Sequence, residues 1–216
     1  TVLPAAPLAW PLVLGWLALL VAFVWSCQQT RKNSERARRW GWAYYPVAMN
    51  AAFTMLGPTI KNATSWRADP LLFAIDTHLV GTNLSLRMEP WVSPVLSEIM
   101  SFGYMFFMLL LFGMMLFYLF VSPYLARCYT GLFSVYGLGF IGYTFVPAAG
   151  PYVALADRFT TPIHGGWLTA LNEQMVSAGS NHVDVFPSLH IAVSLFLWLT
   201  LLKDYRRLGV WLTPLL

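Results

Sequence analysis

The chain is poor in charge and almost free of cysteine. Only 10% of its 216 residues are Asp, Glu, Lys or Arg, against about 25% in an ordinary water-soluble domain, and 58% are apolar. This composition excludes a soluble globular enzyme, a disordered tail and a nucleic-acid-binding module. The two cysteines, Cys27 and Cys128, lie far apart, so they form no metal-binding or redox spacing and imply no disulfide framework.

Long apolar runs take the place of the missing charge. A helix needs roughly 20 mostly apolar residues to cross about 30 Å of hydrocarbon. We therefore predict an all-α fold, a polytopic bundle of membrane helices with five full spans. A further short helix, over 70–80, is expected to lie in the membrane interface. The five spans are expected at about 7–27, 41–60, 94–121, 132–146 and 187–202, the fourth extended toward Tyr129.

A sixth apolar run starts at Leu208 and reaches Leu216, the last residue of the sequence. About nine residues rise about 14 Å in a helix, which is too short to cross the bilayer. The run either lies in the interface or, as we prefer, begins a sixth transmembrane helix that continues beyond it. We divide the chain into an N-terminal transmembrane helix with a basic loop (1–40) and a main membrane domain (41–216), expected to be incomplete at its C-terminus.

The charges predict how the bundle is oriented. If the spans alternate, one side holds nine basic and two acidic residues, in 28–40, 122–127 and 203–207. The other side holds four basic and seven acidic residues. Because basic residues are retained in the cytoplasm, the first side is expected there. The N-terminus and the two long loops, 61–91 and 147–186, are then extracytoplasmic.

Polar chemistry concentrates in the second of these loops, just before the fifth span. Pro187 is expected to open that helix, with Asp184 or its neighbours near the cap. Ser188 and His190 would then lie in its first turn, where free N–H groups and the helix dipole favour an anion. A hydroxyl and an imidazole beside a bound phosphate could supply a hydrogen bond and a proton to the leaving oxygen. The alternative is a plain helix start whose histidine anchors at the headgroups.

A resemblance to a known family is carried by Phe186-Pro187-Ser188-Leu189-His190. This string resembles the second signature of the type-2 phosphatidic acid phosphatase superfamily, and it is most similar to the branch of inositol phosphorylceramide synthases. The loop 145–152 is similar to the loop before that signature. The resemblance implies a six-helix phosphatidic acid phosphatase-like core that acts on a lipid phosphate or phosphodiester at the outer membrane face. It also implies a phosphohistidine mechanism, with His190 as general acid and Ser188 as phosphate ligand.

Two family signatures depart from their usual form. Lys61 and Arg67 do not have the spacing of the first signature, and Arg158 is the first cation after the 145–152 loop. We expect these three residues to contact the substrate phosphate. The third signature, which carries the nucleophilic histidine, has no match. The protein is therefore expected to be a membrane lipid phosphatase or phosphotransferase if a further segment supplies that histidine. Otherwise it would be a catalytically incomplete scaffold for other membrane subunits.

Few other side chains suggest chemistry. The Asp76/His78 and His182/Asp184 pairs could meet His190 at a metal, but no spacing enforces this, so we expect neither metal nor cofactor. Glu98, near the outer end of the third span, is either a functional acid in the membrane or an interfacial glutamate. The expected partners are membrane lipids and a lipid phosphate.

Overall fold

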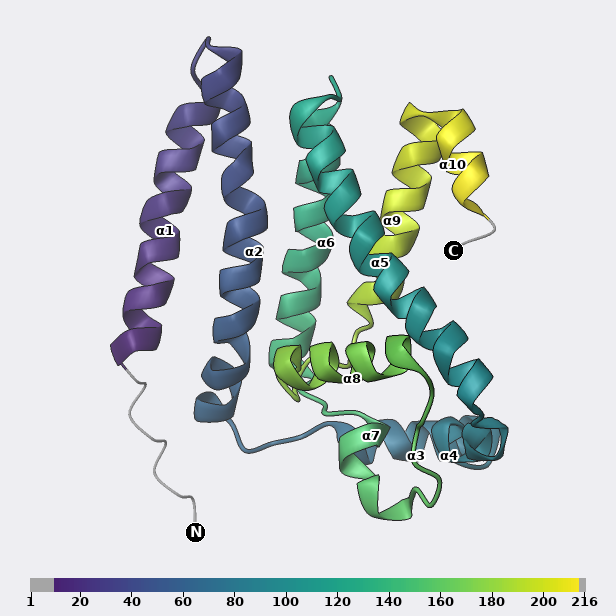
Figure 1. Ribbon diagram of the computed structural model, residues 1–216. Helices are drawn as coiled ribbons and strands as arrows, with labels where there is room; N and C mark the ends of the chain where they lie inside the picture. Colours follow the sequence, from purple (N-terminus) through teal and green to yellow (C-terminus); the bar gives the residue numbers. More distant parts are fainter. Residues whose placement is uncertain (1–9, 214–216) are drawn as a thin grey trace.

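The computed structural model describes residues 10–213, and within this range it is built of helices joined by short loops, with no strand (Figure 1). The helices are α1 (Trp10–Thr30), α2 (Glu35–Ala63), α3 (Asp69–Val80), α4 (Leu84–Met88), η1 (Glu89–Trp91), α5 (Pro94–Phe120), α6 (Leu125–Phe145), α7 (Pro151–Ala154), η2 (Ala156–Arg158), α8 (Trp167–Gly179), α9 (Leu189–Asp204) and α10 (Arg206–Leu212).

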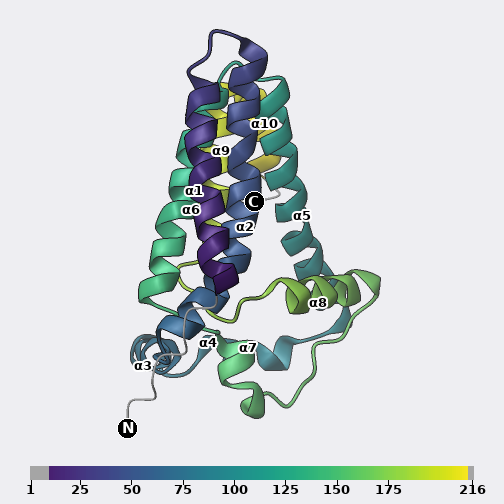
Figure 2. The ribbon, with the colours of Figure 1, turned by 90° about the vertical axis from the view of Figure 1, so that its left-hand side faces the viewer.

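The long helices α1, α2, α5, α6 and α9 run side by side, and at one end of the bundle short turns join α1 to α2, α5 to α6 and α9 to α10 (Figures 1 and 2). We call this the turn end. The opposite end carries a layer made by 64–93 and 146–188, in which α3, α4, α7 and α8 lie across the bundle. A helix over 70–80 was predicted from the sequence, and α3 forms there. This layer covers the end of the bundle at which α9 begins.

Two of the described helices, α1 and α5, are long and apolar enough to cross a membrane. The start of the first expected span, at 7–9, lies outside the described residues. The 16 residues of α9 rise only about 24 Å, less than the hydrocarbon thickness. The all-α fold is therefore confirmed, whereas five complete spans go beyond what length and composition establish.

The basic segment 28–40, expected to be a loop, is mostly helical. The Ser34 hydroxyl caps α2 by accepting a hydrogen bond from Ala37 N (3.4 Å), and Glu35 pairs with Arg39 one turn later. These local interactions stabilise the start of α2, so this charged segment forms a helix although it has few apolar side chains to bury. As a result, α2 is continuous through residues 40 and 41, where we divided the sequence.

Two further boundaries differ from expectation. Helix α6 begins at Leu125, about one turn before the expected extension toward Tyr129, and Cys128 and Tyr129 are both buried. The apolar run from Leu208 contributes to α10, which turns back along α9 (Figure 1). Trp198 Nε1 of α9 donates to Thr213 Oγ1 at 3.1 Å. Residues 214–216 of this run lie outside the described range.

A polar network closes the turn end. The Asp204 side chain is fully buried and accepts hydrogen bonds from Arg127 and from the Tyr118 hydroxyl (3.0 Å). The neighbouring Tyr205 hydroxyl donates to Ser122 Oγ (2.9 Å). Because these residues come from α5, α6, the α5–α6 turn and the end of α9, the network fixes three long helices relative to one another.

Candidate active site

The start of α9 is held by two glycines of α6. A Cβ added at Gly142 would lie 2.4 Å from Pro187 Cδ, and one at Gly139 would lie 2.4 Å from Leu189 Cδ2. At such distances a Cβ would force the Pro187 ring or the Leu189 side chain to shift. The glycines therefore let the chain before α9 approach α6 closely, and this packing sets where the helix begins.

Helix α9 begins at Leu189, so the prediction that Pro187 opens it was wrong. Pro187 lies before the helix, packed on α6, and Ser188 is the N-cap residue with extended backbone (φ −71°, ψ 102°). Asp184 is also outside the cap, because its backbone pairs with Ala148. Ser188 makes no capping hydrogen bond, which leaves its hydroxyl available to a ligand. His190 lies in the first turn, as predicted.

Asp69 anchors the loop that faces this turn. Asp69 is 6% exposed, and its carboxylate accepts hydrogen bonds from Ala149 N (3.0 Å) and Gly150 N (2.8 Å). In the same loop, the carbonyl oxygen of Ala148 accepts a hydrogen bond from Val185 N (3.3 Å). The start of α3, the 145–152 loop and the segment before α9 are thus joined in one hydrogen-bonded unit.

We expect Asp69→Ala to lower the free energy of unfolding by about 1–3 kcal/mol, because two loop N–H groups lose their acceptor in a partly buried site. Asp76→Ala is the matched control on the same helix, since Asp76 accepts one side-chain hydrogen bond from Asn83 (3.2 Å). Thermal unfolding of both variants in detergent checks this. Equal losses for the two variants would contradict the anchoring role of Asp69.

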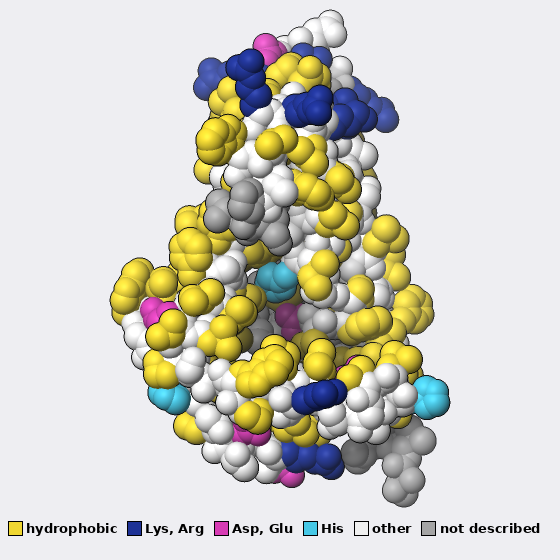
Figure 3. Space-filling view, turned by 90° about the vertical axis from the view of Figure 1, so that its right-hand side faces the viewer, with side chains coloured by type: hydrophobic (Ala, Val, Ile, Leu, Met, Phe, Trp, Pro, Cys, Tyr) yellow, Lys and Arg dark blue, Asp and Glu magenta, His cyan; other side chains and the backbone are white. Residues whose placement is uncertain are grey.

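A cavity of about 450 Å³ opens beside Ser188 and His190. Asp184, Tyr104 and Tyr143 also line it, and Figure 3 shows a histidine and an acidic side chain in a hollow of this face. The rest of its wall is mostly apolar, with residues from α2, α5, α6 and α8: Met49, Phe53, Phe107, Met108, Leu111, Phe112, Tyr136, Phe140, Met175 and Val176. The cavity is therefore amphipathic: Ser188, His190 and Asp184 lie at or just before the start of α9, and Asn50 and Ser180 are further polar residues of the wall.

The imidazole of His190 is held by two aromatic rings of α5. Its ring centroid lies 4.8 Å from that of Tyr104 and 4.7 Å from that of Phe107. These contacts orient the ring while it remains exposed to the cavity. The sequence analysis missed both residues. Their i, i+3 spacing places them on one helix face, but nothing in the sequence shows that this face meets α9.

The three expected phosphate-binding cations do not line this cavity. Lys61 is exposed in the last turn of α2, and Arg158 is exposed in η2. Arg67 donates to the carbonyl of Trp66 (2.9 Å), within its own segment. The structure thus places Ser188 and His190 at one cavity and leaves Lys61, Arg67 and Arg158 outside it.

Two glutamates position the layer around the cavity. Glu98 Oε1 accepts from Thr169 N (2.8 Å) and Thr169 Oγ1 (2.7 Å), so it caps α8, one wall of the cavity. This gives Glu98 a structural role. Glu89 accepts hydrogen bonds from Thr161 N and Thr160 N, and these lower its pKa. Since the folded pKa is depressed, this tether is complete at neutral pH and weakens as pH falls through that pKa.

No group of three or more His, Cys, Asp or Glu side chains within 10–213 is arranged to hold a metal ion. The sequence suggested that the Asp76/His78 and His182/Asp184 pairs could meet His190 at a metal. Of these residues, only Asp184 lines the cavity with His190.

The fold and site define a class: an all-helical protein with membrane-length helices and a Ser/His pair at a helix N-terminus. The PAP2 superfamily profile matches residues 76–216, which run from α3 to α10 and include Ser188 and His190. The chain therefore belongs to the PAP2 superfamily, which confirms the family predicted from the sequence. No curated protein and no solved structure matches the chain.

Proposed function

We propose that the protein is a multi-pass membrane lipid phosphatase or phosphotransferase of the inositol phosphorylceramide synthase-like branch. It acts on a lipid phosphate or phosphodiester at the extracytoplasmic face. In this proposal α1, α2, α5, α6 and α9 all span the bilayer. Membership of the PAP2 superfamily supports a phosphatase or phosphotransferase activity.

The distribution of charge supports the orientation. Lysine and arginine side chains gather at the turn end of the molecule (Figure 3). The residues there include Arg31, Lys32, Arg36, Arg38, Arg39, Arg127, Lys203, Arg206 and Arg207. The positive-inside rule assigns this end to the cytoplasm. The layer at the other end, with the α9 N-terminus and its cavity, is then extracytoplasmic.

The observation that carries the proposal is the amphipathic cavity at His190. Ser188, His190 and the free N–H groups of the first turn of α9 lie at its polar end, and these groups suit a phosphate. Its aromatic and aliphatic walls extend between α2, α5 and α6, and these suit a hydrocarbon chain. A small water-soluble phosphoester would leave those apolar walls unused.

The geometry supports distinct roles for the two residues. Ser188 and the α9 N–H groups would bind phosphate oxygens and stabilise charge that develops on them. His190, in its imidazolium form, would donate a proton to the leaving alcohol oxygen as the P–O bond breaks. A phosphohistidine mechanism also needs a second imidazole as nucleophile. Within 10–213 no other histidine lines the cavity, so the proposal requires the nucleophile to be supplied from outside this lining.

The test is turnover by the purified full-length protein in proteoliposomes. Phosphatidic acid reports hydrolysis, and phosphatidylinositol with a lipid alcohol reports transfer. We expect turnover of a lipid ester and far less of glycerol phosphate, which lacks the chains. Substrate supplied only to the leaflet on the side of the layer should react. If the full-length protein turns over neither lipid, the alternative role as an accessory membrane subunit is favoured.

A further inference from the structure

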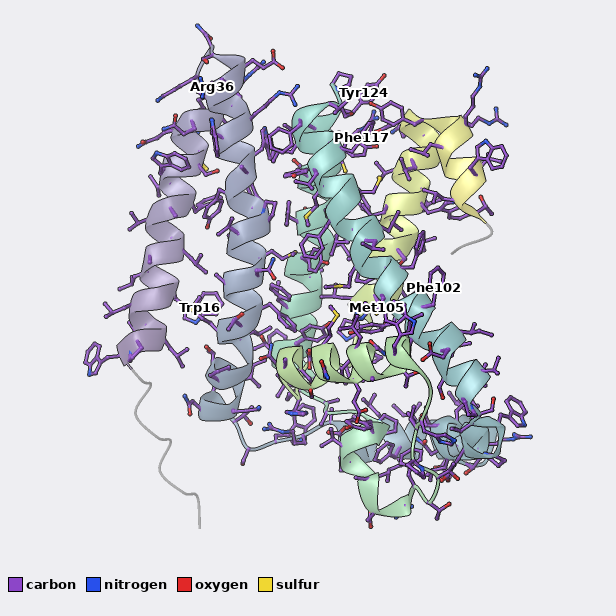
Figure 4. The ribbon with its side chains drawn as sticks, viewed as in Figure 1. Trp16, Arg36, Phe102, Met105, Phe117 and Tyr124 are labelled. Atoms are coloured by element: carbon purple, nitrogen blue, oxygen red, sulfur yellow. The ribbon has the colours of Figure 1, made fainter. Side chains whose placement is uncertain are left out.

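A second cavity lies at the turn end, far from the α9 N-terminus. It measures about 430 Å³ and opens between the start of α2 and the end of α5. Figure 4 shows Arg36 at this end of the bundle. Seven residues line the cavity: Glu35, Arg36, Arg39, Trp40, Ala43, Leu119 and Phe120. We call it the basic groove.

The groove has a charged rim and apolar walls. Arg36 and Arg39 lie one helical turn apart, and Trp40 and Phe120 flank them with 60% and 66% of their surface exposed. Exposed aromatic side chains beside basic residues are typical of the level at which lipid headgroups meet hydrocarbon. A soluble anion would contact the arginines but would gain nothing from these rings.

The two arginines are not equivalent. Arg39 pairs with Glu35 at 2.8 Å and donates to the carbonyl of Leu119 in the last turn of α5. It therefore holds the two helices together and forms one side of the groove. Arg36 is exposed at the rim and has no hydrogen bond or ion pair to another residue of 10–213. Its guanidinium is thus available to a ligand, and Arg38 adds positive charge nearby.

We propose that the basic groove binds the headgroup phosphate of an anionic phospholipid from the cytoplasmic leaflet. Arg36 holds the phosphate, and one acyl chain lies along Ala43, Trp40 and Phe120. Basic pockets between membrane helices on the cytoplasmic side are suited to anionic headgroups. The site is separate from the His190 cavity, and its occupant is not the proposed substrate.

The experiment measures lipid binding to the full-length protein by native mass spectrometry, with phosphatidylglycerol, phosphatidylcholine or glycerol phosphate added. We expect phosphatidylglycerol to bind in preference to phosphatidylcholine, and glycerol phosphate to bind no better than phosphatidylcholine. Arg36→Gln should weaken phosphatidylglycerol binding about fivefold, the effect of one basic residue near the surface. Arg207→Gln, an exposed arginine at the same end outside the groove, should change binding less than twofold.

A second variant tests the apolar wall without changing charge. Ala43→Leu adds bulk to the groove beside Trp40 and should weaken phosphatidylglycerol binding; because Ala43 also packs against the core, thermal unfolding is measured alongside to show that the variant is folded. Equal effects of Arg36→Gln and Arg207→Gln would show general surface attraction and overturn the proposal. Binding of glycerol phosphate as tightly as phosphatidylglycerol would show a free-phosphate site and would also overturn it.

Discussion

His190→Ala is expected to lower turnover of a lipid phosphate by about 10²–10⁴-fold, the range lost when a general acid or base is removed. The imidazole lies at the polar end of the cavity, in the first turn of α9 and against Tyr104 and Phe107. If it protonates the leaving oxygen, its removal slows the breaking of the P–O bond more than it weakens binding. The effect should therefore fall on kcat rather than on KM.

A substrate with a good leaving group separates this role from a structural one. A lipid nitrophenyl phosphodiester releases a phenolate that needs no proton, so His190→Ala should slow its cleavage far less than that of phosphatidic acid. His78→Ala is the control, because His78 is an exposed imidazole of α3 outside the cavity. Equal losses of turnover on both substrates would show that His190 is not the general acid. Full activity of the variant on both would show that His190 takes no part in the mechanism.

Arg127→Met is expected to lower the free energy of unfolding by about 3 kcal/mol, near the low end of the cost of leaving a buried charge without its partner. The Asp204 side chain is fully buried, whereas Arg127 is 47% exposed. The variant leaves the carboxylate with the Tyr118 hydroxyl as its remaining hydrogen-bond donor. Asp204→Asn should cost less, because it leaves a half-exposed guanidinium that water can solvate.

Denaturant unfolding in detergent micelles measures these differences. Arg207→Met removes an exposed arginine from the same end and should change stability by no more than about 0.5 kcal/mol. The double variant Arg127→Met/Asp204→Asn should regain part of the loss, since it removes the unpaired charge. A loss for Arg127→Met no larger than for Arg207→Met would show that the ion pair contributes nothing to the bundle.

Local patterns predicted the helices well and their ends poorly. The apolar runs correctly located α5 and the short α3, because hydrophobicity over many residues reflects the solvent around a helix. The start of α9 was misplaced because it depends on Gly139 and Gly142 of α6, which a reading of the sequence around Pro187 does not include. Similarly, the sequence left Glu98 as either a functional acid or an interfacial glutamate, because its contact with Thr169 of α8 joins residues far apart in the chain.

By itself, the sequence determined the class of this protein: a helical, charge-poor chain of the PAP2 superfamily with a Ser/His pair before an apolar helix. These properties follow from composition and from residues next to one another in the chain. Only the tertiary structure decided which side chains share the cavity. Tyr104, Tyr143 and Asp184 were brought to His190, whereas Lys61, Arg67 and Arg158 were not. Their placement depends on how α3, α5, α6 and α8 pack around α9, and such long-range packing is not encoded in any single local pattern.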